Sequence, residues 1–497
     1  MHVLLQLGKS AEKSSTGSRF FLKGSPPSSV LQDETLRAKM TPLRKSITLY
    51  LLFSFCRGLS ALGQFWHITD LHWDPKYKVT DDPKTVCPSS GSQPVPNAGK
   101  FGDYLCDSPW ALINSSICAM RDILPDPDFI VWTGDDTPHV PNEQLGEEAV
   151  LSIIGNLTDI IRQVFPDTKV YSALGNHDFH PKSQLPGGPN YMYNRTAELW
   201  QAWLEPESLH TFRTGGYYTE KLLNRTGQRV IILNTNLYYD QNMQTAELED
   251  PAGQFKWMDN VLTKAAVDQE KVYILGHVPP GFFEKKRLKA WFRPQFNRYY
   301  LQLIQKHHGV IAGQFFGHHH TDSFRMFYDS NGTPISTMFL APGITPWKTT
   351  LPGVKNGANN PGIRVFEYDP STLLVQDMVT YYLDLTRANL AGARWEKEYR
   401  LSEAFRSPSA SPAAMHGVLR RLAREPCALQ RYHELNSVGY DPSPCDAACR
   451  ADHVCAIREV DFLAYERCLA VEGASPARLR LPPLLLVLPV TLLGAVV

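Results

Sequence analysis

Five apolar runs between residues 64 and 350 each stop at a residue that can bind a metal ion. Each run is rich in β-branched and aromatic side chains, which is typical of buried strands. The runs and their ends are Phe65–Thr69 with Asp70, Phe129–Thr133 with Gly134-Asp135, Val170–Leu174 with Gly175-Asn176-His177, Val272–Leu275 with Gly276-His277, and Val310–Phe316 with Gly317-His318. Helical patterns separate them, including one over Gln254–Val267. Strands that alternate with helices predict an α/β core, whose functional residues lie where strands end and loops begin.

The strand ends together supply seven nitrogen and oxygen ligands, too many for one tetrahedral ion. These ligands are Asp70, His72, Asp135, Asn176, His277, His318 and His320. We therefore predict two ions that share the carboxylate of Asp135. The first ion would also bind Asp70, His72 and His320, and the second would also bind Asn176, His277 and His318. Two ions about 3.5–4 Å apart clamp a phosphate and activate a water for attack on phosphorus. The ligand types suit Zn, Mn, Fe or Co, and residue types alone do not choose among these metals.

The order of these motifs resembles the signature of the calcineurin-like metallophosphoesterases over roughly residues 64–350. Gly134-Asp135-Asp136-Thr137-Pro138-His139 and Gly317-His318-His319-His320-Thr321-Asp322 resemble, more narrowly, the acid sphingomyelinase family, as does the Cys-rich C-terminal module. The core begins within a few residues of a predicted signal peptide, with no saposin-type domain before it. That combination is similar to the acid sphingomyelinase-like phosphodiesterases, and to their membrane-anchored form in particular.

The resemblance implies an α/β fold, an αββα sandwich with a small α-helical, disulfide-stapled C-terminal subdomain. It also implies two Zn²⁺ per chain and catalytic roles for His139 and His177, which would flank the phosphate opposite the metals. Asp178 is a candidate to orient His177. The implied disulfides are Cys87–Cys106, Cys445–Cys449 and Cys455–Cys468. Cys118 and Cys427 are left over, and they could pair with each other or stay free.

The residues after Asp135 favour a phosphodiester over a phosphomonoester. Purple acid phosphatases place a Tyr ligand three residues after the bridging Asp, where this chain has Pro138. Protein Ser/Thr phosphatases place an Arg four residues after it, where the guanidinium can grip a dianionic phosphate. This chain has His139 there. A single imidazole suits a diester, which carries one charge fewer, and it can protonate a leaving alkoxide.

Both ends of the chain resemble targeting segments. Residues 1–39 are a polar upstream extension that a start at Met40 would leave untranslated, and residues 40–63 have the pattern of a secretory signal peptide. Residues 473–497 have the pattern of a GPI-attachment signal, with Gly473, Ala474 or Ser475 as the attachment residue. A tail-anchored helix is the alternative for Leu481–Val497, which is at the lower limit of spanning length.

Between these ends we expect a metallophosphoesterase domain at 64–390, a linker at 391–412 that ends in a Pro/Ser-rich stretch, and a helical Cys-rich subdomain at 413–472. Eight cysteines remain after the signal peptide, and an even number in a secreted chain favours disulfides. Five N-x-[ST] sequons predict a glycoprotein. They lie at Asn114, Asn156, Asn194, Asn224 and Asn331.

The chain carries 50 Lys and Arg and 50 Asp and Glu, so no basic field favours a nucleic-acid polymer as partner. We expect a metal-dependent phosphoric diester hydrolase, monomeric and GPI-anchored on the extracellular face of the plasma membrane, with a secreted form beside the anchored one. Its expected substrates are small nucleotide- or choline-type phosphodiesters, and phosphoanhydrides with them. The alternatives are a sphingomyelin or other lipid phosphodiesterase, a phosphomonoesterase, and a GPI-anchored protein that binds lipids or receptors.

Overall fold

The computed structural model describes residues 61–473, and its strands form two six-stranded sheets. The first sheet has the order β12-β11-β10-β1-β2-β3 and the second β4-β5-β6-β7-β9-β8. The strands are β1 (Gly63–Ile68), β2 (Phe129–Trp132), β3 (Val170–Ser172), β4 (Tyr218–Lys221), β5 (Gln228–Ile232), β6 (Lys271–Leu275), β7 (Ile311–Phe316), β8 (Ser323–Tyr328), β9 (Pro334–Leu340), β10 (Gly362–Tyr368), β11 (Val375–Leu383) and β12 (Trp395–Arg400). The five apolar runs of the sequence form β1, β2, β3, β6 and β7, so the predicted strands are confirmed.

The α-helices fill the connections and cover the outer faces of the sheets. They are α2 (Trp110–Ile123), α3 (Glu147–Val164), α4 (Tyr191–Leu199), α5 (Ser208–Gly215), α6 (Gln254–Val267), α7 (Pro294–His307), α8 (Leu385–Ala391), α9 (Leu401–Phe405), α10 (Pro412–Arg424), α11 (Pro426–Asn436), α12 (Ala447–Arg458) and α13 (Phe462–Glu472). The helix expected at Gln254–Val267 is α6.

Strand β1 shows how the two sheets and the helices are layered. Phe65 stacks on Phe129 of the neighbouring strand and meets the ring of Phe315, in the second sheet, at 5.3 Å between centroids. Trp66 points to the opposite face, where its indole N–H donates to the carbonyl oxygen of Leu124 at the end of α2. This alternation is what the period of a strand requires. The sheets therefore pack face to face with helices outside, and the expected αββα sandwich is confirmed.

Parallel pairing brings the functional loops to one end of the sandwich. Strands β1, β2 and β3 run parallel, as do β5, β6, β7 and β9. The carboxyl ends of parallel strands lie on one edge of their sheet. The edges of the two sheets also meet, because the backbone N–H of Ile344, just after β9, donates to the carbonyl oxygen of Thr69 after β1.

The prediction of a linker at 391–412 is wrong. Strand β12 pairs with β11 at the edge of the first sheet, and α9 follows it directly. Arg400 closes the edge with salt bridges to Glu367 and Asp377. The sequence of β12, WEKEYR, did not indicate a strand, because an edge strand exposes polar side chains and shows little apolar alternation. Residues 395–405 are therefore part of the fold around the first sheet and do not form a linker.

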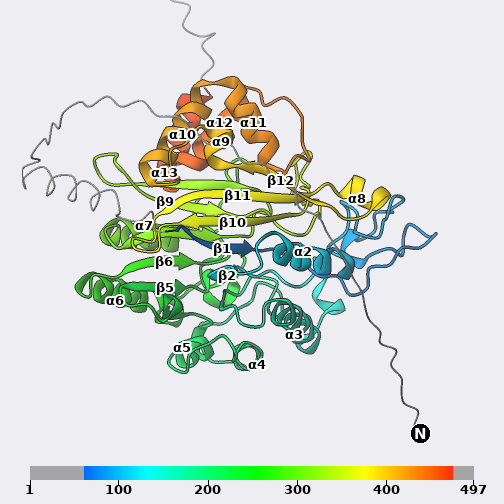
Figure 1. Cartoon of the computed structure of the whole chain (residues 1–497), viewed down its shortest axis with the longest axis horizontal. Coiled ribbons are helices and arrows are strands. Elements are labelled where there is room, and N and C mark those ends of the chain that lie inside the picture. The colour runs from blue at the N-terminus through cyan, green and yellow to red at the C-terminus, as the bar shows by residue number, and fades with distance from the viewer. Residues whose placement is uncertain (1–60, 474–497) are drawn as a thin grey trace, which may run out of the picture. The chain divides into compact units, whose positions relative to one another are not determined.

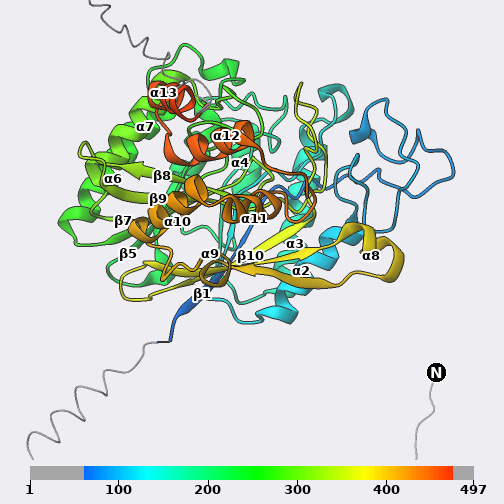
Figure 2. The ribbon, with the colours of Figure 1, turned by 90° about the horizontal axis from the view of Figure 1, so that it is seen from above.

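Helices α10 to α13 form the C-terminal subdomain, close to the expected range, and α10 and α12 pack on β9 and β8. These orange and red helices gather over the strands in both views (Figures 1 and 2). The structure contains the disulfides Cys87–Cys106, Cys445–Cys449 and Cys455–Cys468, the pairs that the resemblance implies. Among residues 61–473, Cys118 and Cys427 are free.

The asparagines of all five sequons are exposed on the described surface. Within residues 61–473 no helix has both the length and the apolar character needed to cross a bilayer. The upstream extension, the signal peptide and the GPI-attachment signal lie almost wholly outside the described residues.

Candidate active site

Six of the seven expected ligand residues, from four of the five strand ends, come together in two groups of three. Within each group, one ligand atom from every residue lies within 4.8 Å of the others. The groups are Asp70, His72 and His320, and Asp135, His277 and His318. The seventh residue, Asn176, lines a pocket that Asp135, His318 and His320 also line. The structure therefore brings together all seven ligands that the sequence predicts.

The carboxylate of Asp135 lies between the two groups. Its Oδ2 atom is 3.5 Å from Nε2 of His72 and 3.1 Å from Nε2 of His277. Within the first group, Nε2 of His320 lies 3.5 Å from Oδ1 of Asp70. Asp135 is therefore placed to bridge two ions, one in each group.

Hydrogen bonds to backbone carbonyls orient the imidazoles for metal binding. Nδ1 of His72 lies 2.7 Å from the carbonyl oxygen of Thr137, and Nδ1 of His277 lies 2.7 Å from that of Thr133. Each Nδ1 must carry the proton to donate to a carbonyl, which leaves Nε2 as a free lone pair. Nε2 of His72 and Oδ1 of Asn176 are buried and have no hydrogen-bond partner. Such atoms are costly to bury unless a further partner, here a cation, satisfies them.

The backbone at the ligands is held in an unusual conformation. Five of the seven ligands have positive φ, a region that residues other than glycine rarely adopt. They are Asp70, His72, Asp135, His318 and His320. A Cβ atom on Gly175 would lie 2.2 Å from the backbone nitrogen of Asp135, so glycine is required there. Strain of this kind persists when the surrounding fold imposes it, and it concentrates at functional sites.

The charge balance of the site also suits cations. The pKa of Asp70 is raised to about 7, mainly by burial, which the charge of His277 opposes and the charge of Asp135 reinforces. The buried carboxyl of Asp70 therefore resists ionisation in the absence of a cation, whereas the neighbouring imidazoles of His277, His177 and His72 keep the pKa of Asp135 low against its burial. A cation beside Asp70 would remove the cost of ionising it. The donor set, the unpartnered lone pairs and the buried carboxylates all fit two metal ions.

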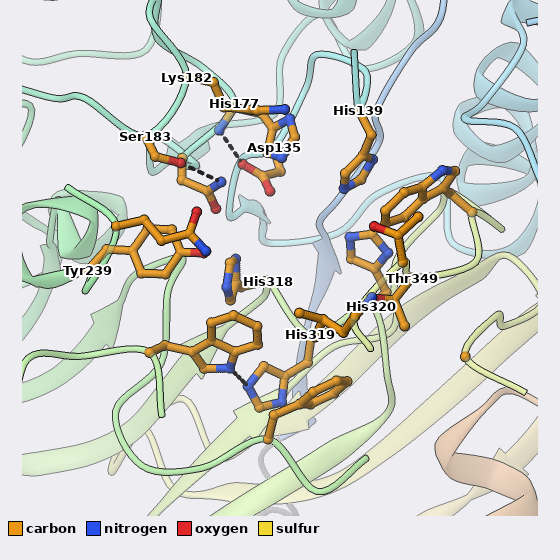
Figure 3. A pocket seen from close by; sticks show the side chains of 18 of the residues that line it. Asp135, His139, His177, Lys182, Ser183, Tyr239, His318, His319, His320 and Thr349 are labelled. Carbon is orange, nitrogen blue, oxygen red and sulfur yellow. Dashed lines mark hydrogen bonds between the residues drawn. The ribbon is translucent and has the colours of Figure 1, made fainter. Parts of the chain in front are cut away.

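His139 and His177 lie beside the ligands, in a pocket of about 250 Å³ (Figure 3). Their ring centroids are 4.4 Å apart, and the centroid of His139 is 4.1 Å from that of His72. Lys182 lines the same wall, and burial lowers the pKa of its ammonium group. The side chains of His139, His177 and Lys182 are thus placed to contact a phosphate on the side opposite the expected metal ligands.

Asp178 does not orient the ring of His177, contrary to the expectation. Its carboxylate accepts hydrogen bonds from the backbone N–H groups of Asp135, Asp136 and Gly175. Asp178 therefore fixes the backbone around Asp135, the expected bridging ligand, and does not contact the ring of His177.

Two residues that support His139 were missed by the sequence reasoning. Oδ1 of Asp107 lies 2.9 Å from Nδ1 of His139, and Oδ2 accepts the backbone N–H of the same residue at 2.6 Å. On the other side the His139 ring stacks on Trp347, with centroids 3.7 Å apart and planes 9° apart. Nδ1–H therefore points to Asp107, and Nε2 is left to exchange a proton in the pocket. Neither Asp107 nor Trp347 belongs to a strand-end motif, so no pattern marked them.

Asp107→Asn is expected to lower kcat for a diester with an alkyl leaving group by about 10–100-fold, the range seen when orienting partners of site residues are removed. KM and bound metal should stay unchanged, because Asp107 binds neither substrate nor metal. Steady-state kinetics and metal analysis check this result. An equal loss for alkyl and p-nitrophenyl leaving groups would contradict a role through His139, because p-nitrophenolate departs without needing a proton.

The chain matches two family models and is similar over most of its length to several known proteins. A model described as calcineurin-like phosphoesterase matches residues 63–322, and one described as acid sphingomyelin phosphodiesterase C-terminal region matches residues 333–475. The chain is 62% identical over 428 residues to acid sphingomyelinase-like phosphodiesterase 3b of Homo sapiens, over 86% of this chain and 94% of the relative. It is 41% identical to cyclic GMP-AMP phosphodiesterase SMPDL3A of Homo sapiens, over 82% and 90%. It is 34% identical to sphingomyelin phosphodiesterase of Bos taurus, over 78% of this chain and 63% of the relative.

Proposed function

This chain belongs to the calcineurin-like phosphoesterase family, and we propose that it is a dinuclear zinc phosphodiesterase of the outer cell surface that cleaves small nucleotide- or choline-type diesters. The family and the names of the relatives make it a phosphodiester hydrolase. The observation that carries the dinuclear proposal is the position of Asp135, whose Oδ2 atom faces an imidazole of each ligand group.

The protein's own residues have distinct tasks in this reaction. When bound, the two ions supply a Lewis acid for the phosphoryl group and lower the pKa of water. His139 donates a proton from Nε2 to the departing alkoxide, while Asp107 holds its ring. His177 and Lys182 line the wall beside it and stabilise the negative charge of the phosphoryl oxygens.

The pocket wall supports a nucleotide-type substrate as the first choice. Tyr239, Phe283, Trp291 and Trp347 line the pocket together with Leu351. Aromatic faces can stack on a nucleobase, with about 1–3 kcal/mol per base. A pocket of about 250 Å³ suits a small diester better than a polymer. One relative is named as a phosphodiesterase of cyclic GMP-AMP, which is a nucleotide diester.

The proposed location is the extracellular face of the plasma membrane, through a GPI anchor. Exposed sequon asparagines and three disulfides support passage through the secretory pathway. The small-residue run at Gly473 to Ser475 and the apolar tail after it support the anchor. Release of the protein from intact cells by a phosphatidylinositol-specific phospholipase C tests this location.

The substrate class is tested by comparing the rates at which the protein cleaves soluble diesters and membrane diesters. Purified protein is expected to cleave a soluble nucleotide diester with a kcat/KM at least about 10-fold above that for sphingomyelin in detergent-free vesicles, because the pocket of about 250 Å³ has room for a small diester and aromatic side chains line it. Both rates are measured on one preparation, with chelator as the control. Faster cleavage of sphingomyelin would make the protein a lipid phosphodiesterase. A rate on p-nitrophenyl phosphate above that on its bis ester would make it a phosphomonoesterase.

A further inference from the structure

A second group of metal-ligating side chains lies in the C-terminal subdomain, separate from the ligand groups of the active site. It consists of His433 on α11, Cys445 before α12, and Cys449 and His453 on α12. One ligand atom from each lies within 4.8 Å of the other three. In the structure the two cysteines form a disulfide. We propose that reduction of the Cys445–Cys449 disulfide by a dithiol creates a Cys₂His₂ site that binds one Zn²⁺.

The geometry of this cluster is close to that of a tetrahedral zinc site. Zn–N bonds of about 2.0–2.1 Å and Zn–S bonds of about 2.3 Å place the ligand atoms about 3.3–3.8 Å apart. Nδ1 of His433 lies 3.2 Å from Nε2 of His453 and 3.7 Å from Sγ of Cys449. Cys449 and His453 are four residues apart on α12, so they share one face of that helix. Three of the four ligands are therefore already near their final positions.

The two imidazoles are prepared for a cation in different ways. Nε2 of His433 lies 3.5 Å from Oδ2 of Asp441, and a carboxylate there favours the proton on Nε2. Nδ1 is then unprotonated and can bind a metal, as in the carboxylate–histidine–zinc arrangement. His453 is buried, and its Nε2 atom, 3.2 Å from Nδ1 of His433, faces the cluster.

Exposure singles out this disulfide among the three that the described residues contain. Cys445 and Cys449 are both partly exposed, whereas the four cysteines of the other two disulfides are buried. The Cys445–Cys449 bridge also spans four residues, against 19 and 13 for the others. A short loop gains the least stability from its cross-link in the chain-entropy model. An added dithiol is therefore expected to reduce this bridge first.

The chemistry of the switch balances with a dithiol as the only reductant. One thiolate of the dithiol attacks a sulfur of the bridge, breaks the S–S bond and forms a mixed disulfide. The second thiol of the reductant then closes its own disulfide and leaves Cys445 and Cys449 as two thiols. Two electrons and two protons have moved to the protein. Zn²⁺ binding then displaces the two thiol protons to solvent.

The test uses cobalt and alkylation on the full chain, because the active-site ligands include no sulfur. After mild dithiol treatment and removal of the reductant, added Co²⁺ is expected to produce a thiolate-to-cobalt charge-transfer band that the untreated protein lacks. Zinc per chain should rise by one. Zn²⁺ should also slow alkylation of Cys445 and Cys449 by at least about 10-fold, because zinc-bound thiolates are shielded. The exposed Cys427 is the internal control and should alkylate at the same rate with and without Zn²⁺.

Two variants separate the site from general reduction of the protein. His433→Gln should weaken the cobalt band and the protection, while Cys427→Ser should leave both intact. Peptide mapping of the wild-type chain decides the result even if His433→Gln does not fold. Absence of the band and of the protection overturns the proposal. Protection confined to Cys87 and Cys106, or to Cys455 and Cys468, overturns it as well.

Discussion

Asp135→Asn is expected to lower diester hydrolysis by at least about 10³-fold and to reduce bound metal to one ion per chain or less. Asp135 is the residue whose single oxygen atom faces both His72 and His277. An amide has no charge to hold two cations together in a buried site, so both their number and their spacing should change. Hydrolysis of bis-p-nitrophenyl phosphate and metal analysis by mass spectrometry measure the two effects.

Asp122→Asn is the matched control for this variant. Asp122 lies on α2 with 71% of its side chain exposed, so the same chemical change there should alter neither metal content nor rate. The melting temperature of the Asp135 variant shows whether its fold is intact. A folded Asp135→Asn protein that retains two ions and more than about a tenth of the activity would exclude a bridging role.

His139→Gln is expected to lower kcat by about 10²–10⁴-fold for a diester with an alkyl leaving group, the range of general acid catalysis. Glutamine can donate a hydrogen bond but cannot transfer a proton at neutral pH. The loss should be much smaller with p-nitrophenol as leaving group, because its anion leaves without protonation. Kinetics with both leaving groups, together with metal analysis, measure the effect.

The leaving-group dependence distinguishes His139 as an acid from His139 as a metal ligand. Bound metal should stay the same in His139→Gln, since the ring turns Nδ1 to Asp107 and stacks on Trp347 beside the two ligand groups. Asp107→Asn should show the same dependence with a smaller loss. A uniform loss accompanied by lost metal would place His139 among the ligands.

The clustering of the expected metal ligands could be predicted from sequence because these residues follow regular strands. Asp70, Asp135 and His277 each come directly after a buried apolar run or its terminal glycine, and parallel strands bring such ends together. Their spacing along the chain therefore translates into proximity in space. The same reasoning placed Asn176 correctly beside the cluster.

The supporting groups could not be predicted because loops carry them. Asp107 precedes α2 and reaches His139 across 32 residues, and Trp347 lies in an irregular segment after β9. Contacts of this kind depend on the paths of loops, which have no period. Strand β12 was missed for a related reason, since its charged sequence is the solvent-exposed edge of a sheet.

The measurement that tests the dinuclear phosphodiesterase most directly combines metal content and ester preference on one sample of purified protein. About two metal ions per chain are expected, with chelator-sensitive hydrolysis that favours bis-p-nitrophenyl phosphate over p-nitrophenyl phosphate. Two ions per chain would fit a site in which Asp135 bridges them. A preference for the diester would fit His139, a single imidazole at the position where protein Ser/Thr phosphatases have an arginine that binds a dianionic phosphate. A single ion per chain, or faster hydrolysis of the monoester, would contradict the account.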